Sequence, residues 1–308
     1  MKKYIHVSVG NINIDIALYL KTYPLVGENV FASDIDIRPG GAASNYAIAV
    51  AQYGHQSYLI ASASTHPFVE VFLQALRSRG VYVDRVKVVD SPPGIVVILI
   101  GPNGERTMIN YPGANVELTP DDIPSDITNN AHVLHMASIS ADRTLEISRR
   151  FRSRGLLITY DPGPQINSLQ ENLRVLEFID ALFVNRKEFE RIREIVSLEE
   201  MFKHGLHQLI VKKGAEGAIL LLPSGTCYSG RAEPIKKPID TTGAGDAFDA
   251  FFNAKYIESK DPAIALRYAL AAGALKVGYK GSGLILDHKL LSLQLDKTIV
   301  MRSASCEP

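Results

Sequence analysis

The sequence predicts an α/β protein with three layers, α/β/α, around a central and mostly parallel sheet, with a small β-sheet lid beside it. Short apolar runs alternate with helical patterns along most of the 308 residues, and this alternation requires crossover connections between parallel strands. Apolar residues make up 46% of the chain and charged residues 21%, which excludes a disordered protein. Two segments contain strand-like patterns only, and these predict the separate lid.

The main body alternates strands and helices from its first residues. Tyr4–Val9 is a short apolar run that suits a buried strand. Asn45–Tyr53 is rich in alanine and lies between glycines, which predicts a helix. The same reasoning predicts the other elements, in chain order: a strand Ser57–Ala63, a helix Phe68–Ser78, a strand His132–Ala137, a helix Arg143–Arg154, and strands Leu156–Tyr160, Ala181–Val184 and Gln208–Val211.

The lid is predicted to consist of two separate segments, residues 11–38 and 94–112. The first segment alternates apolar and polar residues without a convincing helix. The second contains a hairpin with strands Ile95–Ile100 and Thr107–Tyr111 and the turn Gly101–Gly104. The remaining residues then form one main domain, which consists of residues 1–10, 39–93 and 113–308.

Charge and cysteine content exclude several classes of protein. Lys and Arg number 33, as do Asp and Glu, and this balance argues against binding nucleic acid or a membrane surface through bulk positive charge. No apolar run approaches the roughly 20 residues that a membrane helix needs, and the N-terminus lacks a signal-peptide core. Cys227 and Cys306 are too few for a disulfide framework or a zinc cluster, and Arg302–Pro308 looks like a loose tail. We therefore expect a cytoplasmic protein without nucleic-acid or membrane partners.

The most informative stretch is Asp240–Phe248, which directly precedes and enters an amphipathic helix. Its two glycines let the backbone approach a ligand closely, and the free amides and dipole of a helix N-terminus attract an anion. Asp246 lies in the first turn, where a carboxylate can accept a proton from a nearby hydroxyl. A helix N-cap explains the threonines and the aspartate separately, but not all nine residues together. Amides for a phosphate and a base for a hydroxyl are what phosphoryl transfer requires.

This stretch resembles the C-terminal signature of the ribokinase-like (PfkB) carbohydrate kinases. Further matches to the family are collinear from about residue 4 to residue 285, and they are Gly10–Asp15, Gly40–Asn45, Tyr111–Asn115, Asn185–Glu188 and Val211–Gly217. The resemblance implies a ribokinase-like fold and an ATP- and Mg²⁺-dependent kinase that phosphorylates a hydroxyl of a small sugar.

The resemblance also implies the roles of individual residues. Asp246 would be the catalytic base. The anion hole for the migrating phosphoryl group would consist of the backbone amides of Gly243, Ala244 and Gly245. The residues that would contact the acceptor are Asn13, Asp15, Gly41 and Asn45. Asn13 and Asp15 could instead be turn residues without a ligand.

On the nucleotide side, Lys212 and Gly214 would lie along ATP, and Asn185 and Glu188 would organise Mg²⁺ and phosphate through water. Lys212 could equally be a surface lysine, and Glu188 a solvated helix charge paired with Lys187 or Arg191. Residues 161–164 follow a strand and could hold a ligand or form a turn. Positions that often hold a monovalent cation such as K⁺ are occupied by Asp240 and Thr242, together with the loop Gly281–Gly283.

The acceptor pocket departs from that of ribokinases proper. Ala42 replaces their usual lysine, and Ser138-Ile139-Ser140 replaces a segment that carries a glutamate. A more apolar pocket makes ribose doubtful and would also suit a nucleobase. Arg106 could reach a phosphate or carboxylate on the acceptor, or it could be an exposed lid arginine.

Three hypotheses follow: a sugar kinase, a nucleoside kinase of the same family, and a non-catalytic sensor of sugar or nucleotide on the same fold. A kinase is favoured over a sensor because Asp246 and both glycines are intact, and a sugar is placed slightly ahead of a nucleoside as its acceptor. The lid strands also present an apolar face, represented by Ile95, Val97 and Leu99 or by their alternates. Exposed strand edges favour pairing, so we expect a homodimer that forms through the lid.

Overall fold

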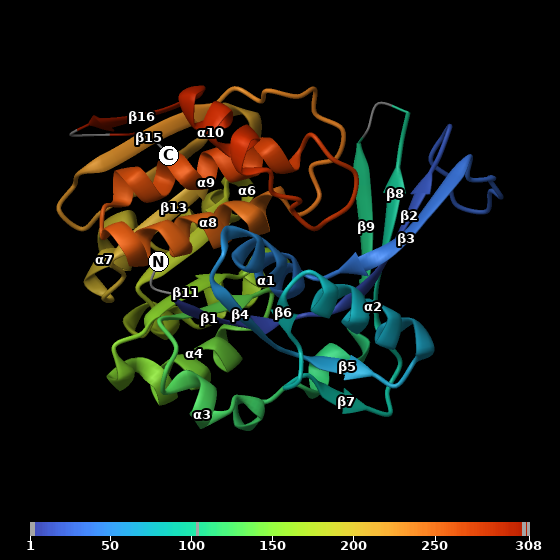
Figure 1. Ribbon diagram of the computed structural model, residues 1–308, viewed down its shortest axis with the longest axis horizontal. Helices are drawn as coiled ribbons and strands as arrows, with labels where there is room; N and C mark the ends of the chain where they lie inside the picture. The colour runs from blue at the N-terminus through green and yellow to red at the C-terminus, as the bar shows by residue number, and fades with distance from the viewer. Residues whose placement is uncertain (1–3, 103–104, 304–305, 307–308) are drawn as a thin grey trace.

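A ten-stranded sheet forms the centre of the computed structural model, which describes residues 4–102, 105–303 and 306 (Figure 1). From β13 to β6 all neighbouring strands are parallel, and the last three strands at the other edge are antiparallel. The strands, in spatial order, are β16 (Thr298–Ser303), β15 (Cys227–Ala232), β14 (Ala218–Leu221), β13 (Gln208–Lys212), β12 (Ala181–Asn185), β11 (Leu157–Asp161), β10 (Val133–Ala137), β1 (Ile5–Gly10), β4 (Gln56–Ile60) and β6 (Val81–Tyr82).

Helices cover both faces of this sheet, which confirms the predicted three layers. One face packs against α1 (Ala42–Tyr53), α8 (Ala244–Ser259) and α9 (Pro262–Lys276), with α2 (Pro67–Ser78) beside α1 and α10 (His288–Asp296) against α9. The opposite face packs against α4 (Ala141–Phe151), α5 (Ile166–Glu171), α6 (Arg186–Arg193) and α7 (Leu198–Lys203). Figure 1 shows α8 and α9 on one side of the sheet and α4 on the other.

Several element boundaries differ from the prediction. The predicted strand Ser57–Ala63 divides into β4 and a short strand β5 (Ser62–Ser64), which leaves the main sheet and pairs with β7 (Lys87–Val89). The helix expected from Arg143 begins earlier, because the Ser140 side chain accepts a hydrogen bond from the Arg143 amide and caps the helix. None of the described helices combines the length and the apolar content that a membrane span needs.

The C-terminal tail is not loose at its start, contrary to the prediction. Arg302 and Ser303 belong to β16, which pairs with β15 along the sheet edge. Cys306 forms a disulfide with Cys227 of β15, so the two cysteines suffice for one bridge although they are too few for a framework. The bridge joins residues 79 positions apart in the sequence. The other tail residues, 304–305 and 307–308, lie outside the described residues.

A separate four-stranded sheet stands beside the main body and corresponds to the predicted lid (Figure 1). Its spatial order is β3 (Asp34–Gly40), β2 (Asn13–Tyr19), β8 (Gly94–Ile100) and β9 (Arg106–Tyr111). β3 continues two residues past the predicted limit at 38, and residues 103–104 of the predicted hairpin turn lie outside the described residues. The division of the chain into a main domain and a discontinuous lid remains a prediction.

The two faces of the lid differ in chemistry. Asp15 of β2 lies opposite Arg38 of β3 and Val96 of β8, and this face, which turns toward the main body, carries the polar residues. The other face, here called the outer face, carries apolar side chains from all four strands. They are Ile16, Leu18, Ile35, Ile37, Ile95, Val97, Leu99, Ile109 and Tyr111.

Candidate active site

A cavity of about 520 Å³ opens at the carboxyl ends of the parallel strands. Asp161, Asn185 and Lys212, the last residues of β11, β12 and β13, line it together with Gly245 and Asp246 at the start of α8. Ligands gather at this edge in open α/β sheets. A second cavity, of about 560 Å³, shares no lining residue with the first.

The start of α8 has the backbone geometry that the glycine-rich motif predicts. Gly243 is the N-cap residue with φ of 77°, in the left-handed region, and a Cβ there would lie 1.9 Å from the carbonyl oxygen of Ser282. Only glycine therefore permits this turn. The Ala244 amide donates to the Thr241 carbonyl at 3.2 Å. This hydrogen bond would have to break before the amide could donate to a phosphate in the anion hole.

Asp246 is half-buried in the first turn of α8, and its carboxylate is held by α1. Asn45 Nδ2 donates to Asp246 Oδ2 at 2.8 Å. Burial raises the pKa of Asp246 to about 6, while the hydrogen bond from Asn45 and the charges of Lys212 and Lys276 oppose the rise. The carboxylate is therefore ionised at pH 7 but is a stronger base than an exposed aspartate.

Two of the predicted acceptor residues, Asn45 and Asp15, lie near Asp246, although neither lines the cavity. Asn45 is buried, and its Oδ1 has no hydrogen-bond partner among the described residues, so it can accept a bond from a ligand hydroxyl. Asp15 is also buried, which raises the pKa of its carboxyl to about 7 against the opposing charge of Arg38. A Cβ on Gly40 would lie 2.0 Å from Asp15 Oδ1, so this glycine makes room for the carboxylate.

Two further predicted acceptor residues lie at the junction of the lid and the main body. Gly41 is the N-cap of α1 with φ of 100°, and a Cβ there would lie 2.2 Å from the carbonyl oxygen of Asn11. Asn13 Oδ1 accepts a hydrogen bond from Asn115 Nδ2 at 2.8 Å, and Asn115 Oδ1 accepts from the Ile12 amide at 3.0 Å. Asn115 belongs to the Tyr111–Asn115 motif that carries part of the family resemblance, but the sequence alone indicated no role for it. The contacts show that it positions Asn13.

Lys212 is not a surface lysine. Its ammonium contacts Asp161 Oδ2 at 2.6 Å and both carboxylate oxygens of Asp249 at 3.0 Å, and all three side chains are largely buried. Burial lowers the pKa of Lys212, but the two carboxylates outweigh it and hold the pKa above the ordinary value. A Cβ on Gly245 would lie 3.5 Å from Lys212 Nζ. Lys212 therefore adds a buried positive charge directly beside the predicted anion hole.

Sequence reasoning missed Asp249 and left the role of Asp161 open. Asp249 lies three residues after Asp246 and hence on a neighbouring face of α8. This spacing is the only local feature of the sequence that could have identified Asp249 as a site residue. Burial raises the pKa of Asp249 well above the ordinary value, whereas Lys212 helps to hold the pKa of Asp161 below it, against the effect of burial. Two acids and one lysine thus form a buried cluster in which both carboxylates share one positive charge.

Asn185 and Glu188 hold each other in a reciprocal helix cap. Asn185 Oδ1 accepts from the Glu188 amide at 3.0 Å, and Glu188 Oε2 accepts from the Asn185 amide at 2.8 Å. Neither of the predicted pairings of Glu188, with Lys187 or Arg191, is present among the described residues. Burial raises the pKa of Glu188 to about 7, and the charge of Asp161 raises it further.

The residues present fit a Mg²⁺ ion that is bound mainly through water. Glu188 and Asp161 both line the cavity. Among the described residues, no group of three or more His, Cys, Asp or Glu side chains could enclose a metal. Mg²⁺ keeps several water ligands and is bound through one or two carboxylates together with substrate phosphates.

Gly214 also lines the cavity, with φ of 60° in the turn after β13. No atom lies within 4 Å of a Cβ built at this position. Its predicted place along the nucleotide therefore rests on the cavity and not on a close backbone contact. Ser138 lines the same cavity with φ of 58°, which is uncommon for a residue with a side chain.

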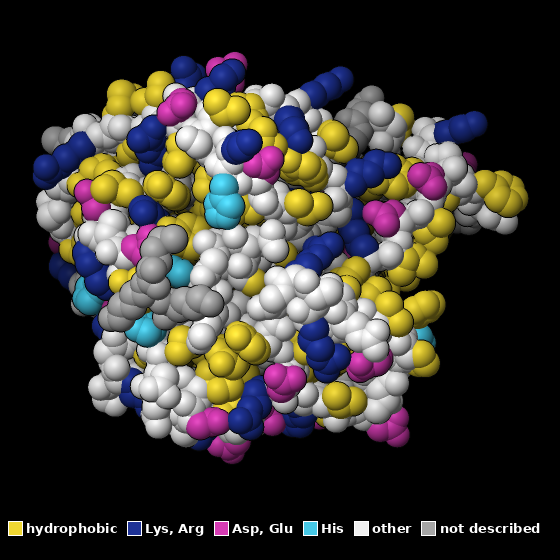
Figure 2. Space-filling view, in the orientation of Figure 1, with side chains coloured by type: hydrophobic (Ala, Val, Ile, Leu, Met, Phe, Trp, Pro, Cys, Tyr) yellow, Lys and Arg dark blue, Asp and Glu magenta, His cyan; other side chains and the backbone are white. Residues whose placement is uncertain are grey.

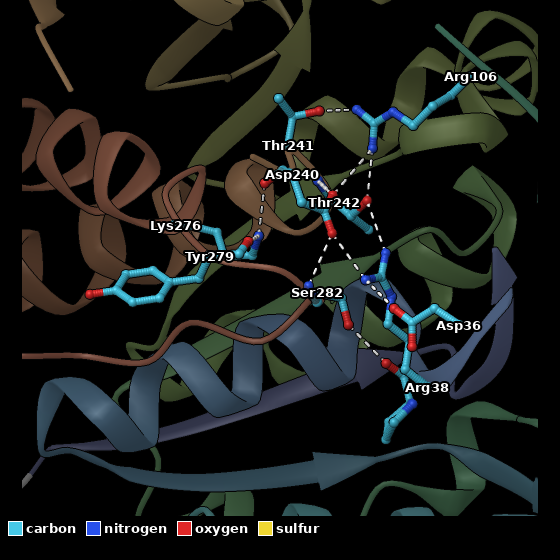
Figure 3. A network of polar contacts seen from close by, with 11 residues as sticks. Asp36, Arg38, Arg106, Asp240, Thr241, Thr242, Lys276, Tyr279 and Ser282 are labelled. Carbon is cyan, nitrogen blue, oxygen red and sulfur yellow. Dashed lines mark hydrogen bonds and ion pairs between the residues drawn. The ribbon is translucent and has the colours of Figure 1, made fainter. Parts of the chain in front are cut away.

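Arg106 reaches the loop before α8 rather than the predicted acceptor residues. Its guanidinium donates to Thr242 Oγ1 at 2.7 Å and also to Thr241 Oγ1. Arg38 of β3 joins it from the lid and donates to Asp240 Oδ2 at 3.0 Å (Figure 3). Sequence reasoning missed Arg38, although its position opposite Asp15 across the β2–β3 pairing places it on the polar face of the lid. Two lid arginines therefore tie the lid to the loop that carries the predicted anion hole.

The chain is similar to known carbohydrate kinases. The model of the pfkB family of carbohydrate kinases matches residues 6–289. A ribokinase of Lactococcus lactis is 28% identical over 273 residues, which cover 87% of this chain and 89% of the ribokinase. An ATP-dependent ribose-1-phosphate kinase of Halopiger xanaduensis is 28% identical over 282 residues, which cover 90% of this chain and 93% of that kinase. The structure of Arabidopsis thaliana ribokinase complexed with ribose and ATP has a TM-score of 0.82 and 26% identity, and the match covers 96% of this chain and 99% of that one.

Proposed function

The chain belongs to the PfkB family of carbohydrate kinases, and we propose that it transfers the γ-phosphoryl group of ATP to a hydroxyl group of a small sugar. One observation carries this proposal: the Asp246 carboxylate stands in the first turn of α8, at the cavity, with Asn45 holding one oxygen. A base for a hydroxyl and the positive end of a helix for a phosphate meet at that point.

In the proposed reaction, the acceptor hydroxyl lies between Asp246 and the γ-phosphorus of ATP. The hydroxyl oxygen attacks the phosphorus, its proton passes to an Asp246 carboxylate oxygen, and ADP leaves with the bridging oxygen. The amides at the start of α8 and the Lys212 ammonium stabilise the negative charge of the migrating group. Mg²⁺, held through water by Glu188 and Asp161, would neutralise charge on the phosphates when bound.

The acceptor pocket supports a sugar through its hydrogen-bonding groups. Asp15 and Asn45 Oδ1 can each accept a bond from a hydroxyl, and Asn13 is positioned beside them by Asn115. Lid closure through Arg38 and Arg106 would exclude water from the transfer and limit hydrolysis of ATP.

The test of this proposal is acceptor-dependent ADP formation by the purified protein with Mg²⁺ and ATP. The panel contains neutral sugars, sugar phosphates, sugar acids and nucleosides at equal concentrations. We expect turnover with at least one sugar or sugar derivative. Turnover with nucleosides alone would replace the sugar acceptor with a nucleoside. Tight binding by calorimetry without any turnover would support a sensor and contradict a kinase.

The rate should depend on the ionisation of Asp246. Burial raises its pKa to about 6, and only the ionised carboxylate can accept a proton. The value of kcat/KM for the acceptor should therefore fall as the pH drops below about 6, by about tenfold per pH unit. Burial raises the pKa of Asp15 to about 7, so this carboxyl would also titrate in the same pH range. The Asp15→Asn variant removes that titration and leaves the transition of Asp246 near pH 6. A profile of that variant which stays flat down to pH 5 would contradict the assignment of Asp246 as base.

We also propose that two copies pair through the outer face of the lid. Ile35, Ile37 and Ile109 are between 48% and 59% exposed on this face. Figure 2 shows exposed hydrophobic side chains on the lid, at the right of the view. Continuous exposed apolar surface on a monomer favours association. The four-stranded lid also has two open edges, β3 and β9.

Ile109→Glu should convert the dimer to a monomer, because a carboxylate on the outer face cannot be buried against apolar side chains without a large desolvation cost. Met108→Glu is the matched control: Met108 is 47% exposed and neighbours Ile109 on β9 but belongs to the opposite face. Light scattering at micromolar protein concentration measures both. A wild-type protein that is monomeric under these conditions would rule out the lid dimer.

A cytoplasmic location remains a prediction. The Cys227–Cys306 disulfide argues against it, because persistent disulfides are uncommon in a reducing cytosol.

A further inference from the structure

Lys276 contacts Asp240, one of the positions at which the family resemblance implies a monovalent cation. It is the last residue of α9 and is fully buried, with no exposed surface. Its ammonium donates to the carbonyl oxygen of Asp240 at 3.0 Å and to that of Tyr279 at 3.3 Å (Figure 3). Both acceptors are backbone carbonyls, the kind of ligand that a K⁺ site uses. Asp240 belongs to the loop before α8 and Tyr279 to the loop after α9.

The carboxylate of Asp240 is occupied as well. Asp240 Oδ2 accepts from Arg38 Nη1 at 3.0 Å and from the Gly281 amide at 3.0 Å, and Asp240 Oδ1 accepts from the Thr242 amide at 2.9 Å. Arg106 Nη1 lies 3.8 Å from Asp240 Oδ1. A K⁺ ion here would have to displace Lys276 from the carbonyls. It would also be repelled by the positive charges of Lys276, Arg38 and Arg106. The residues present therefore do not fit a monovalent cation.

We infer that the Lys276 ammonium permanently takes the place of a monovalent cation beside the anion hole, so that this enzyme works without K⁺. The inference concerns the same site as the proposed kinase activity and rests on it for its functional meaning. A tethered ammonium has the charge and nearly the size of a free monovalent ion, and its binding costs no loss of translational freedom.

The position of Lys276 explains what this charge does. It bonds the loop after α9 to the loop before α8, and the two loops approach so closely that Gly243 lies against the carbonyl of Ser282. Its charge also opposes the rise in the pKa of Asp246 that burial causes. Burial lowers the pKa of Lys276 itself to about 8, and the charges of Arg38 and Arg106 also lower it, whereas the Asp240 charge opposes this.

The first experiment measures thermal stability without ATP or acceptor, so its result does not depend on catalysis. The Tm of the wild-type protein is compared in KCl, NaCl and choline chloride at equal ionic strength, and we expect no difference among the salts. The Lys276→Ala variant vacates the carbonyls, and its Tm should rise specifically in KCl or NH₄Cl, since a ligand that binds only the folded state stabilises it.

Lys236→Met is the matched control. Lys236, like Lys276, contacts Tyr279, but its ammonium donates to the Tyr279 hydroxyl at 2.8 Å and not to the backbone carbonyl. It should behave as the wild type does in every salt. Lys276→Met keeps the volume of the side chain, and it should lose Tm without regaining it in KCl, because the methionine chain fills the space.

The second experiment repeats the comparison with turnover. Wild-type kcat should change by less than about twofold among the three salts, whereas Lys276→Ala should lose at least about tenfold in choline chloride and recover with NH₄Cl or KCl. A K⁺-specific rise in the wild-type Tm would overturn the inference, as would a Lys276→Ala variant that ignores both cations. If neither the wild type nor any variant has kinase activity but the expected salt dependence of Tm is observed, the result would contradict the proposed function alone.

Discussion

The kcat of the Asp246→Asn variant should be about 10²–10⁴-fold lower than that of the wild type, because the amide cannot accept the proton of the attacking hydroxyl. Initial rates of ADP formation at saturating ATP and acceptor measure this effect. The loss should appear mainly in kcat and not in the KM for ATP, because the carboxylate acts on the acceptor hydroxyl. A variant that retains wild-type turnover would disprove the assignment of the base.

The same variant should be at least as stable as the wild type. Burial raises the pKa of Asp246, which means that the folded state disfavours the ionised carboxylate, and at pH 7 this charge reduces the free energy of unfolding. A neutral asparagine removes that cost and can still accept the bond from Asn45. Asp142→Asn is the control, since Asp142 also lies in the first turn of a helix, α4, but not at the cavity. It should leave kcat unchanged.

Lys212→Met should destabilise the protein by about 3–5 kcal/mol, because the variant leaves two buried carboxylates without their counter-ion. Asp161 and Asp249 are 14% and 1% exposed, and Lys212 is 15% exposed, so solvent screens the cluster weakly. Urea unfolding measures the change in the free energy of unfolding.

Two variants separate this effect from a general loss of charge. Lys213→Met changes the adjacent, half-buried lysine, which makes no ion pair among the described residues, and should alter stability by less than about 0.5 kcal/mol. Adding Asp249→Asn to Lys212→Met removes one of the unpaired carboxylates and should restore part of the lost stability. If Lys212→Met unfolds at the same urea concentration as the wild type, the cluster does not bear the buried charge we assign to it.

Local sequence signals predicted the parts of the site that one segment builds. The α/β fold, the family and the kinase class are confirmed, because strand and helix periodicity and the glycine-rich motif are each contained within a few neighbouring residues. The turn at Gly243 and the place of Asp246 in the first turn of α8 follow from the motif itself. The boundaries of β4 and β5 were harder to predict, because which sheet a strand joins depends on a distant partner.

The sequence by itself determined which backbone turns and helix ends are available, since those depend on residues next to one another. Only the tertiary structure decided which side chains meet there. Arg38 and Asp240 are 202 positions apart, Asn45 and Asp246 are 201 apart, and the Cys227–Cys306 bridge spans 79. Lys276 illustrates the difference most clearly. The family resemblance implied a monovalent cation beside the anion hole. Only the folded chain revealed that the ammonium of Lys276 occupies the two carbonyls, because a buried charge is stabilised by whatever partners the packing brings within reach.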